Sequence, residues 1–151
     1  MRDTIYSKPL NKISPFVFDK RVAHVFDDMI NRSVPGYTDI IHMCGVLAVL
    51  YVKPHTRVYD LGCSLGAASH AVLQAVPEKK YELVAVDSSQ AMIEKSKLNL
   101  KGKYFAKVLF NYSNVETTAI KNASFVMLNF VSQFIQKDMR FPLLTSNLPT
   151  Y

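Results

Sequence analysis

Apolar residues recur every three or four positions in the first third of the chain, and this spacing predicts two helices before any strand. The first helix begins after Asp19, which is placed to cap it. Its apolar positions are Val22, Ala23, Val25, Phe26, Met29 and Ile30. A proline–glycine pair within residues 33–37 predicts a turn, and a second helix is predicted from about Thr38 to Tyr51. The first eighteen residues are predicted to form an irregular arm packed on the domain.

Short apolar runs then alternate with helical patterns. The predicted strands are Arg57–Leu61, Glu82–Val86, Lys107–Asn111 and Ser124–Asn129. Helices are predicted over residues 66–76 and after Ser88 or Ser89, either of which can serve as the cap. Strands that alternate with helices imply right-handed crossovers and a parallel sheet, so the predicted fold class is α/β. The fourth run is apolar on both faces, as expected of a central parallel strand.

Length and composition suit one globular domain, with 151 residues, 49% hydrophobic and 20% charged. No apolar run is long enough for a membrane span and no signal peptide is visible, so a cytoplasmic protein is expected. Its two cysteines, Cys44 and Cys63, are expected to be reduced thiols. The net charge is +6, but the lysines at 95, 97, 101, 103 and 107 lack interleaved arginines and aromatics. They predict a solvated helix face, and direct contact with nucleic acid is not expected.

The segment between the first strand and the next helix carries the clearest functional signal. Its sequence, Gly-Cys-Ser-Leu-Gly over Gly62–Gly66, predicts a turn that leaves free backbone N–H groups at the N-terminus of the following helix and gives a ligand close access to the backbone. Asp87 ends the second strand at the offset where nucleoside sites place a carboxylate on ribose hydroxyls. A helix cap or an incidental surface acid is the alternative role for this residue. Together, loop and carboxylate predict a nucleoside-type site.

The loop differs from the phosphate-binding patterns. It lacks the middle glycine of the dinucleotide fingerprint, and no Lys-Ser/Thr pair follows the second glycine as in a Walker loop. The hydroxyl of Ser64 instead fits a ligand that presents an amino-acid carboxylate and amine. S-adenosylmethionine is such a ligand.

The stretch Tyr59–Ala68 resembles the first motif of the class I S-adenosylmethionine-dependent methyltransferase superfamily, whose fold is Rossmann-like. The wider sequence is similar to one branch, the carboxy-S-adenosylmethionine synthases. The matching stretches are residues 2–7, 18–19, 25–30, 32–37, 85–89, 122–124 and 128–130. The resemblance implies conversion of S-adenosylmethionine, with prephenate as carboxylate donor, into carboxy-S-adenosylmethionine for the modification of wobble uridine in tRNA. It also implies a homodimer.

The resemblance implies roles for residues at the methionine end of the cofactor. Tyr37 would contact that end, and Gly62, Cys63 and Ser64 would hold it through backbone and side chains. Two alternatives remain open. Tyr37 could be an ordinary tyrosine at a helix start, and Cys63 could matter only as a small residue that fits.

Other positions are implied to bind the rest of the cofactor. Asp87 would take the ribose hydroxyls, with Ser88 beside it near the adenine, and Asn129 would face the sulfonium and the transferred group. The alternative for Asn129 is a turn residue at a strand end. Asn114 and Val115 stand where the family has an aspartate that bonds the adenine amino group, and the loss of that charge costs about 1 kcal/mol of binding. No catalytic residue is assigned and no metal site is predicted.

The resemblance fails after about residue 145, where the family continues with a helix and a fifth strand. We therefore expect residues 1–53 to form an arm and helices that cap the cofactor site, and residues 54–151 to form the first half of the cofactor-binding domain. The expected sheet has four strands and is incomplete at the C-terminus, through a shifted reading frame or an early stop. Phe125 to Asn129 would then be an exposed edge.

The arginine that the family uses for the product's carboxylate has no counterpart. A methyltransferase acting on a small molecule or RNA, and an inactive remnant, are the alternative functions.

Overall fold

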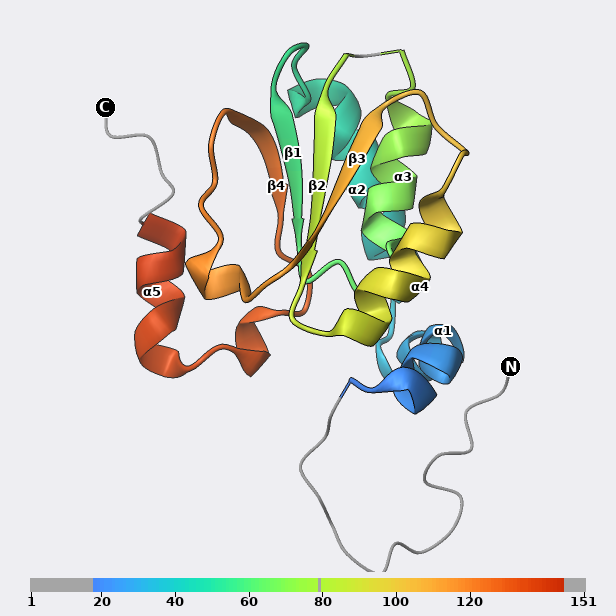
Figure 1. Ribbon diagram of the computed structural model, residues 1–151, viewed down its shortest axis with the longest axis vertical. Helices are drawn as coiled ribbons and strands as arrows, with labels where there is room; N and C mark the ends of the chain where they lie inside the picture. Colours follow the sequence, from blue (N-terminus) through green and yellow to red (C-terminus); the bar gives the residue numbers. More distant parts are fainter. Residues whose placement is uncertain (1–17, 79, 146–151) are drawn as a thin grey trace, which may run out of the picture.

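The computed structural model describes residues 18–78 and 80–145, and it contains one parallel sheet of four strands in the order β3-β2-β1-β4 (Figure 1). The strands are β1 Arg57–Leu61, β2 Glu82–Asp87, β3 Lys107–Tyr112 and β4 Ala123–Met127. The parallel α/β sheet predicted from the sequence is therefore confirmed. The predicted arm lies outside the described residues, apart from Phe18.

Five α-helices and two short 3-10 helices accompany the sheet in the described part of the chain. They are α1 Lys20–Ser33, α2 Tyr37–Tyr51, α3 Ala67–Ala75, α4 Gln90–Leu100, η1 Val115–Thr117, η2 Ser132–Phe134 and α5 Lys137–Thr145. Asp19 caps α1 as predicted, because its carboxylate accepts the N–H groups of Arg21 and Val22. Of the two candidate caps for α4, Ser89 is the one whose hydroxyl accepts a helix N–H.

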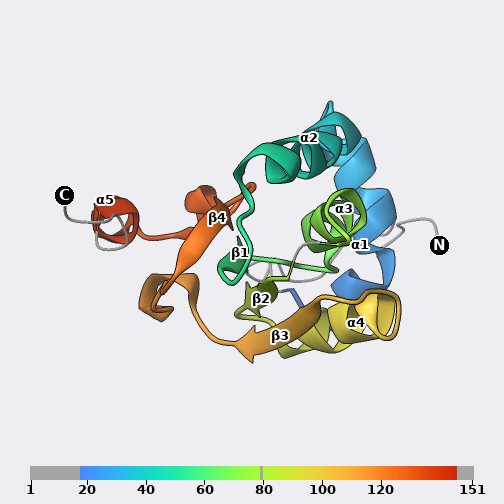
Figure 2. The same ribbon diagram turned by 90° about the horizontal axis from the view of Figure 1, so that it is seen from above.

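The helices are distributed unevenly over the sheet. Figure 2 shows α2, α3 and α4 on one side and α5 on the other, while α1 lies below the ends to which the strands point in Figure 1. Alternate residues of β1 serve the two sides: Val58 packs in the core under α2 and α3, whereas Tyr59 packs with Val84 on the opposite side. Among the described residues, no single helix is long and apolar enough to cross a membrane. The pair α1 and α2 reaches that length and composition only jointly, across a bend of 98°.

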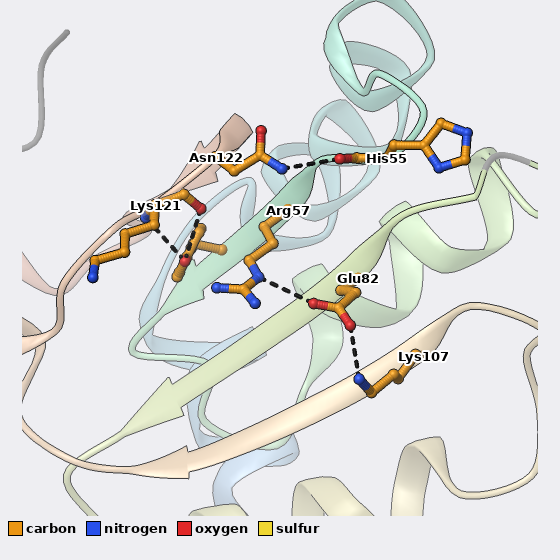
Figure 3. Close-up of polar contacts among 7 residues, drawn as sticks. His55, Arg57, Glu82, Lys107, Lys121 and Asn122 are labelled. Atoms are coloured by element: carbon orange, nitrogen blue, oxygen red, sulfur yellow. Dashed lines mark hydrogen bonds and ion pairs between the residues drawn. The ribbon is translucent and has the colours of Figure 1, made fainter.

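A charged network joins the amino ends of three strands (Figure 3). The carboxylate of Glu82 on β2 bonds Arg57 of β1 at 3.0 Å and Lys107 of β3 at 2.7 Å. Nearby, the side-chain amide of Asn122 donates to the carbonyl of His55. Solvent screens these partly exposed charges, so each pair stabilises the fold only weakly, but the bonds link the first residues of three neighbouring strands in the observed register.

The fourth strand is shorter and more exposed than its apolar sequence predicts. β4 ends at Met127, so Asn129 lies beyond the strand, where Phe130 turns the chain with a φ of 57°. Within the described residues the strand also lies at the edge of the sheet and pairs with β1 alone, and Val126 is 42% exposed. The expectation of an exposed edge is confirmed, while the expectation of a strand buried on both faces is wrong. An apolar sequence allows a strand to be buried on both faces. How much of it is buried depends on the strands and helices that pack against it.

The open edge makes a prediction about self-association. Val126→Lys should reduce it, because a lysine on an exposed edge opposes pairing with another chain. Light scattering over a concentration series measures the effect. Phe105→Lys is the matched control, since Phe105 is fully exposed, lies outside the strands and gives the same change of charge. Equal scattering from both variants would contradict association through β4.

Candidate cofactor site

A cavity of about 590 Å³ lies at the carboxyl ends of the strands, where parallel α/β sheets bind their ligands. Its walls come from α1, α2, the loop after β1, the end of β2, η1 and the segment after β4. All the residues predicted for the cofactor line it. They are Tyr37, Gly62, Cys63, Ser64, Asp87, Ser88, Asn114, Val115 and Asn129. The structure thus brings together positions up to 92 residues apart in sequence (129 − 37).

The loop after β1 is held by the end of β2. The backbone N–H groups of Gly62 and Cys63 donate to the carbonyl of Val86 at 2.8 and 2.9 Å, and that of Ser64 donates to the Asp87 carboxylate at 2.9 Å. These three N–H groups are therefore engaged within the protein, as is that of Ser69 at the start of α3. The bonds hold the loop rigidly against the strand, but they remove donors that a phosphate would need.

The two glycines of the loop are required by neighbours within the protein. Both have positive φ, 79° at Gly62 and 87° at Gly66. A Cβ at Gly62 would lie 2.2 Å from the side chain of Val131, and a Cβ at Gly66 would lie 2.8 Å from Ser96 Oγ on α4. Two elements therefore pack directly on the loop: the segment that follows β4, and helix α4. These contacts within the protein by themselves exclude larger residues at both positions, and Gly62 also lines the cavity.

The carboxylate of Asp87 bonds two neighbouring segments and lines the cavity. Its Oδ2 accepts the Ser64 N–H, and its Oδ1 accepts the N–H of Ser89 at 2.8 Å, so it ties the loop to the start of α4. Burial raises the pKa of its carboxyl group. A carboxylate has about four acceptor positions, so capacity remains for hydroxyl groups in the cavity that it lines.

The buried carboxylate of Asp60 is a wall residue that the sequence reasoning missed. Its Oδ2 accepts the backbone N–H and the hydroxyl of Ser69 at 3.0 and 2.6 Å, within the first turn of α3. The helix N-terminus, which would otherwise attract an anion, is therefore already occupied by a carboxylate of the chain. Burial, followed by the charge of Asp87, raises the pKa of Asp60 to about 6. Its position at the end of a buried strand, directly before the glycine loop, was the available signal.

The charge of the wall is opposite to that of the chain. Asp60, Asp87 and Glu116 line the cavity, and its described wall contains no lysine, arginine or histidine, although the chain carries a net charge of +6. Such a wall attracts cations and repels phosphates.

Aromatic and apolar side chains complete the wall. The ring of Tyr37 lies 6.0 Å from that of Phe130, and burial, followed by the charges of Asp27 and Asp60, raises the pKa of Tyr37 to about 12. The side-chain amide of Asn129 donates to Cys44 Sγ at 3.3 Å. Further wall residues are Phe18, Phe26, Met29 and Phe134. The spacing of residues in the sequence does not predict these aromatic contacts.

The family model for a methyltransferase domain matches residues 58–144, which is more than half of the chain. The chain therefore belongs to the methyltransferase-domain family. In sequence it is similar to carboxy-S-adenosyl-L-methionine synthase of Vibrio cholerae, with 47% identity over 144 residues that cover 95% of this chain. The chain spans 58% of the length of that relative.

Solved structures confirm the fold. A candidate S-adenosyl-L-methionine-dependent methyltransferase of Methanococcus maripaludis matches with a TM-score of 0.66 and 17% identity, over 92% of this chain and 63% of that one. The plantazolicin methyltransferase, solved in complex with SAH, matches with a TM-score of 0.54 and 19% identity, over 82% of this chain and 48% of that one. The Rossmann-like methyltransferase fold expected from the sequence is thus confirmed.

The raised pKa of Asp60 makes a prediction about stability and pH. Between its usual pKa of 3.8 and about 6, the folded protein holds a proton that the unfolded chain has lost. The contribution of this proton to the free energy of unfolding is fully present below pH 3.8 and is lost as the pH rises through about 6. The free energy of unfolding of the wild type relative to Asp60→Asn should therefore fall by up to about 3 kcal/mol between pH 4 and 7. Urea unfolding of both proteins measures it, and a pH-independent difference would contradict the assignment.

Proposed function

We propose that this chain binds S-adenosyl-L-methionine in the cavity, as the cofactor-binding part of a transferase of the carboxy-S-adenosylmethionine synthase type. The observation that carries the proposal is the acidic wall, with three carboxylates and no basic side chain among its described residues. S-adenosylmethionine carries a sulfonium and an ammonium group, which such a wall attracts, whereas a dinucleotide or a nucleoside triphosphate would bring phosphates that it repels. The sequence similarity to the Vibrio synthase supports the same cofactor.

The proposed placement of the cofactor follows the wall. Asp87 accepts the ribose hydroxyls, and Ser88, Asn114 and Val115 border the adenine. The methionine end lies between the loop after β1 and α2, in contact with Tyr37, Gly62, Cys63 and Ser64, while Asn129 faces the sulfonium. All of these residues line one cavity, which supports the placement. In this arrangement residues 1–53 cap the site, and residues 54–151 supply the sheet and its loops.

The reaction we propose is the transfer of a carboxyl group from prephenate to S-adenosylmethionine in the cytoplasm. The product, carboxy-S-adenosylmethionine, then supplies a carboxymethyl group for wobble uridine in tRNA. The bound cofactor supplies an activated methyl group beside a sulfonium. The chain orients it through Asp87 and excludes water with the aromatic wall of Tyr37, Phe130 and Phe134. We also propose a homodimer, supported by exposed apolar side chains along α2 such as Met43, Val46 and Leu50.

A second candidate function is cofactor binding without carboxyl transfer. Prephenate is a dianion, and the described wall offers it no lysine, arginine or histidine. The described wall therefore favours the cofactor over the acidic donor.

Titration of the chain with S-adenosylhomocysteine by calorimetry tests the cofactor site. We expect binding in the wild type and roughly ten-fold or greater weakening in Asp87→Asn, because a charged acceptor of two hydroxyl groups is lost. Asp39→Asn, which removes an exposed carboxylate from α2, is the control for charge and should bind as the wild type does. The absence of heat at millimolar ligand, from a protein that circular dichroism shows to be folded, would overturn the proposal.

Mass spectrometry separates the two candidate functions. Incubation with S-adenosylmethionine and prephenate should yield the heavier carboxylated product if the chain catalyses transfer. Cofactor binding without this product would support the second candidate. Unchanged affinity for the cofactor in the presence of prephenate would strengthen that conclusion.

A further inference from the structure

Phe130 holds an unusual backbone conformation in the wall of the cavity. Its φ of 57° lies in the left-handed region, which bulky residues rarely adopt. Such conformations persist only where the surrounding structure holds them, and they concentrate at ligand sites. Phe130 follows Asn129 and precedes Val131, and all three residues line the cavity.

Both neighbours of Phe130 are anchored to other elements. The Asn129 amide donates to Cys44 Sγ on α2, and the side chain of Val131 occupies the space left by the missing Cβ of Gly62. The chain is therefore held on either side of Phe130, which keeps its ring in the wall.

The ring of Phe130 meets the ring of Tyr37 at a centroid distance of 6.0 Å and an interplanar angle of 40°. Both residues line the cavity, so the pair forms an angled aromatic wall. The carboxylate of Asp60 lines the same cavity as this aromatic pair. Aromatic faces beside carboxylates are the arrangement that attracts an organic cation, because the faces of the rings carry negative potential.

We propose that Phe130, together with Tyr37, recognises the positive charge of the sulfonium and makes the site favour S-adenosylmethionine over its uncharged thioether analogue, S-adenosylhomocysteine. The inference rests on the proposed cofactor and adds Phe130 as the residue that determines this selectivity. Phe134 also lines the cavity, but its ring pairs with that of Phe18, at a centroid distance of 5.4 Å, and not with Tyr37. It therefore offers a control position.

The test is the ratio of the affinities for S-adenosylmethionine and S-adenosylhomocysteine, measured by calorimetry. Phe130→Leu should lower this ratio by roughly three- to thirty-fold, the range of a cation–π contact, since the leucine keeps apolar contact but loses the π face. Phe130→Tyr retains the face and should retain the ratio. Phe134→Leu, the matched control, should change both affinities by a similar factor and leave the ratio as in the wild type.

The outcomes separate this inference from the proposed function. If the folded wild type binds neither ligand, the proposed function fails and the inference with it. If the wild type binds both but Phe130→Leu keeps the wild-type ratio, the inference alone is overturned. Phe130→Asn provides a second variant, because asparagine accepts a positive φ and keeps the local backbone. A thermal unfolding curve for each variant confirms that the ratios come from folded protein, and an unchanged ratio in Phe130→Asn also overturns the inference.

Discussion

The attachment of the loop after β1 to the end of β2 is the interaction on which the site depends. Three successive backbone N–H groups, from Gly62 to Ser64, bond the Val86 carbonyl and the Asp87 carboxylate. The same carboxylate accepts the N–H of Ser89 before α4. One strand end therefore positions the loop and the following helix together. Because these donors are used inside the protein, the loop shapes the cavity without acting as an anion cradle.

The electrostatic character of the cavity follows from this arrangement. In phosphate sites of similar topology, loop amides and a helix N-terminus face the ligand. Here Asp60 occupies the first turn of α3 through its bonds to Ser69, and Asp87 occupies a loop amide. The carboxylates that stabilise the backbone also give the wall its negative charge. A single set of hydrogen bonds thus accounts both for the attachment of the loop and for the position of two of the carboxylates in the wall.

The two faces of the sheet are covered to different extents by helices. Three helices cover one side, and the second side is packed by η1, the segment after β4 and α5 (Figure 2). β4 offers an unpaired edge, and α2 exposes apolar side chains such as Met43 and Leu50. The chain spans 58% of the length of its Vibrio relative. The cavity is nevertheless lined by described residues, several of which lie at or after the ends of β1, β2 and β4.

The sequence by itself determined the four strands, the helices α1 to α4, the cap at Asp19 and a set of positions that line one cavity. These features depend on local patterns: apolar periodicity, a capping carboxylate, and a glycine loop followed by an acidic residue. Only the tertiary structure decided that β4 ends early at an edge, that the loop amides are occupied, and that Phe130 meets Tyr37. Each of these depends on contacts between segments far apart in the chain, such as Val131 against Gly62 and Asn129 against Cys44. A local pattern cannot report such contacts, because the neighbour that fills a space or accepts a hydrogen bond is chosen by the fold.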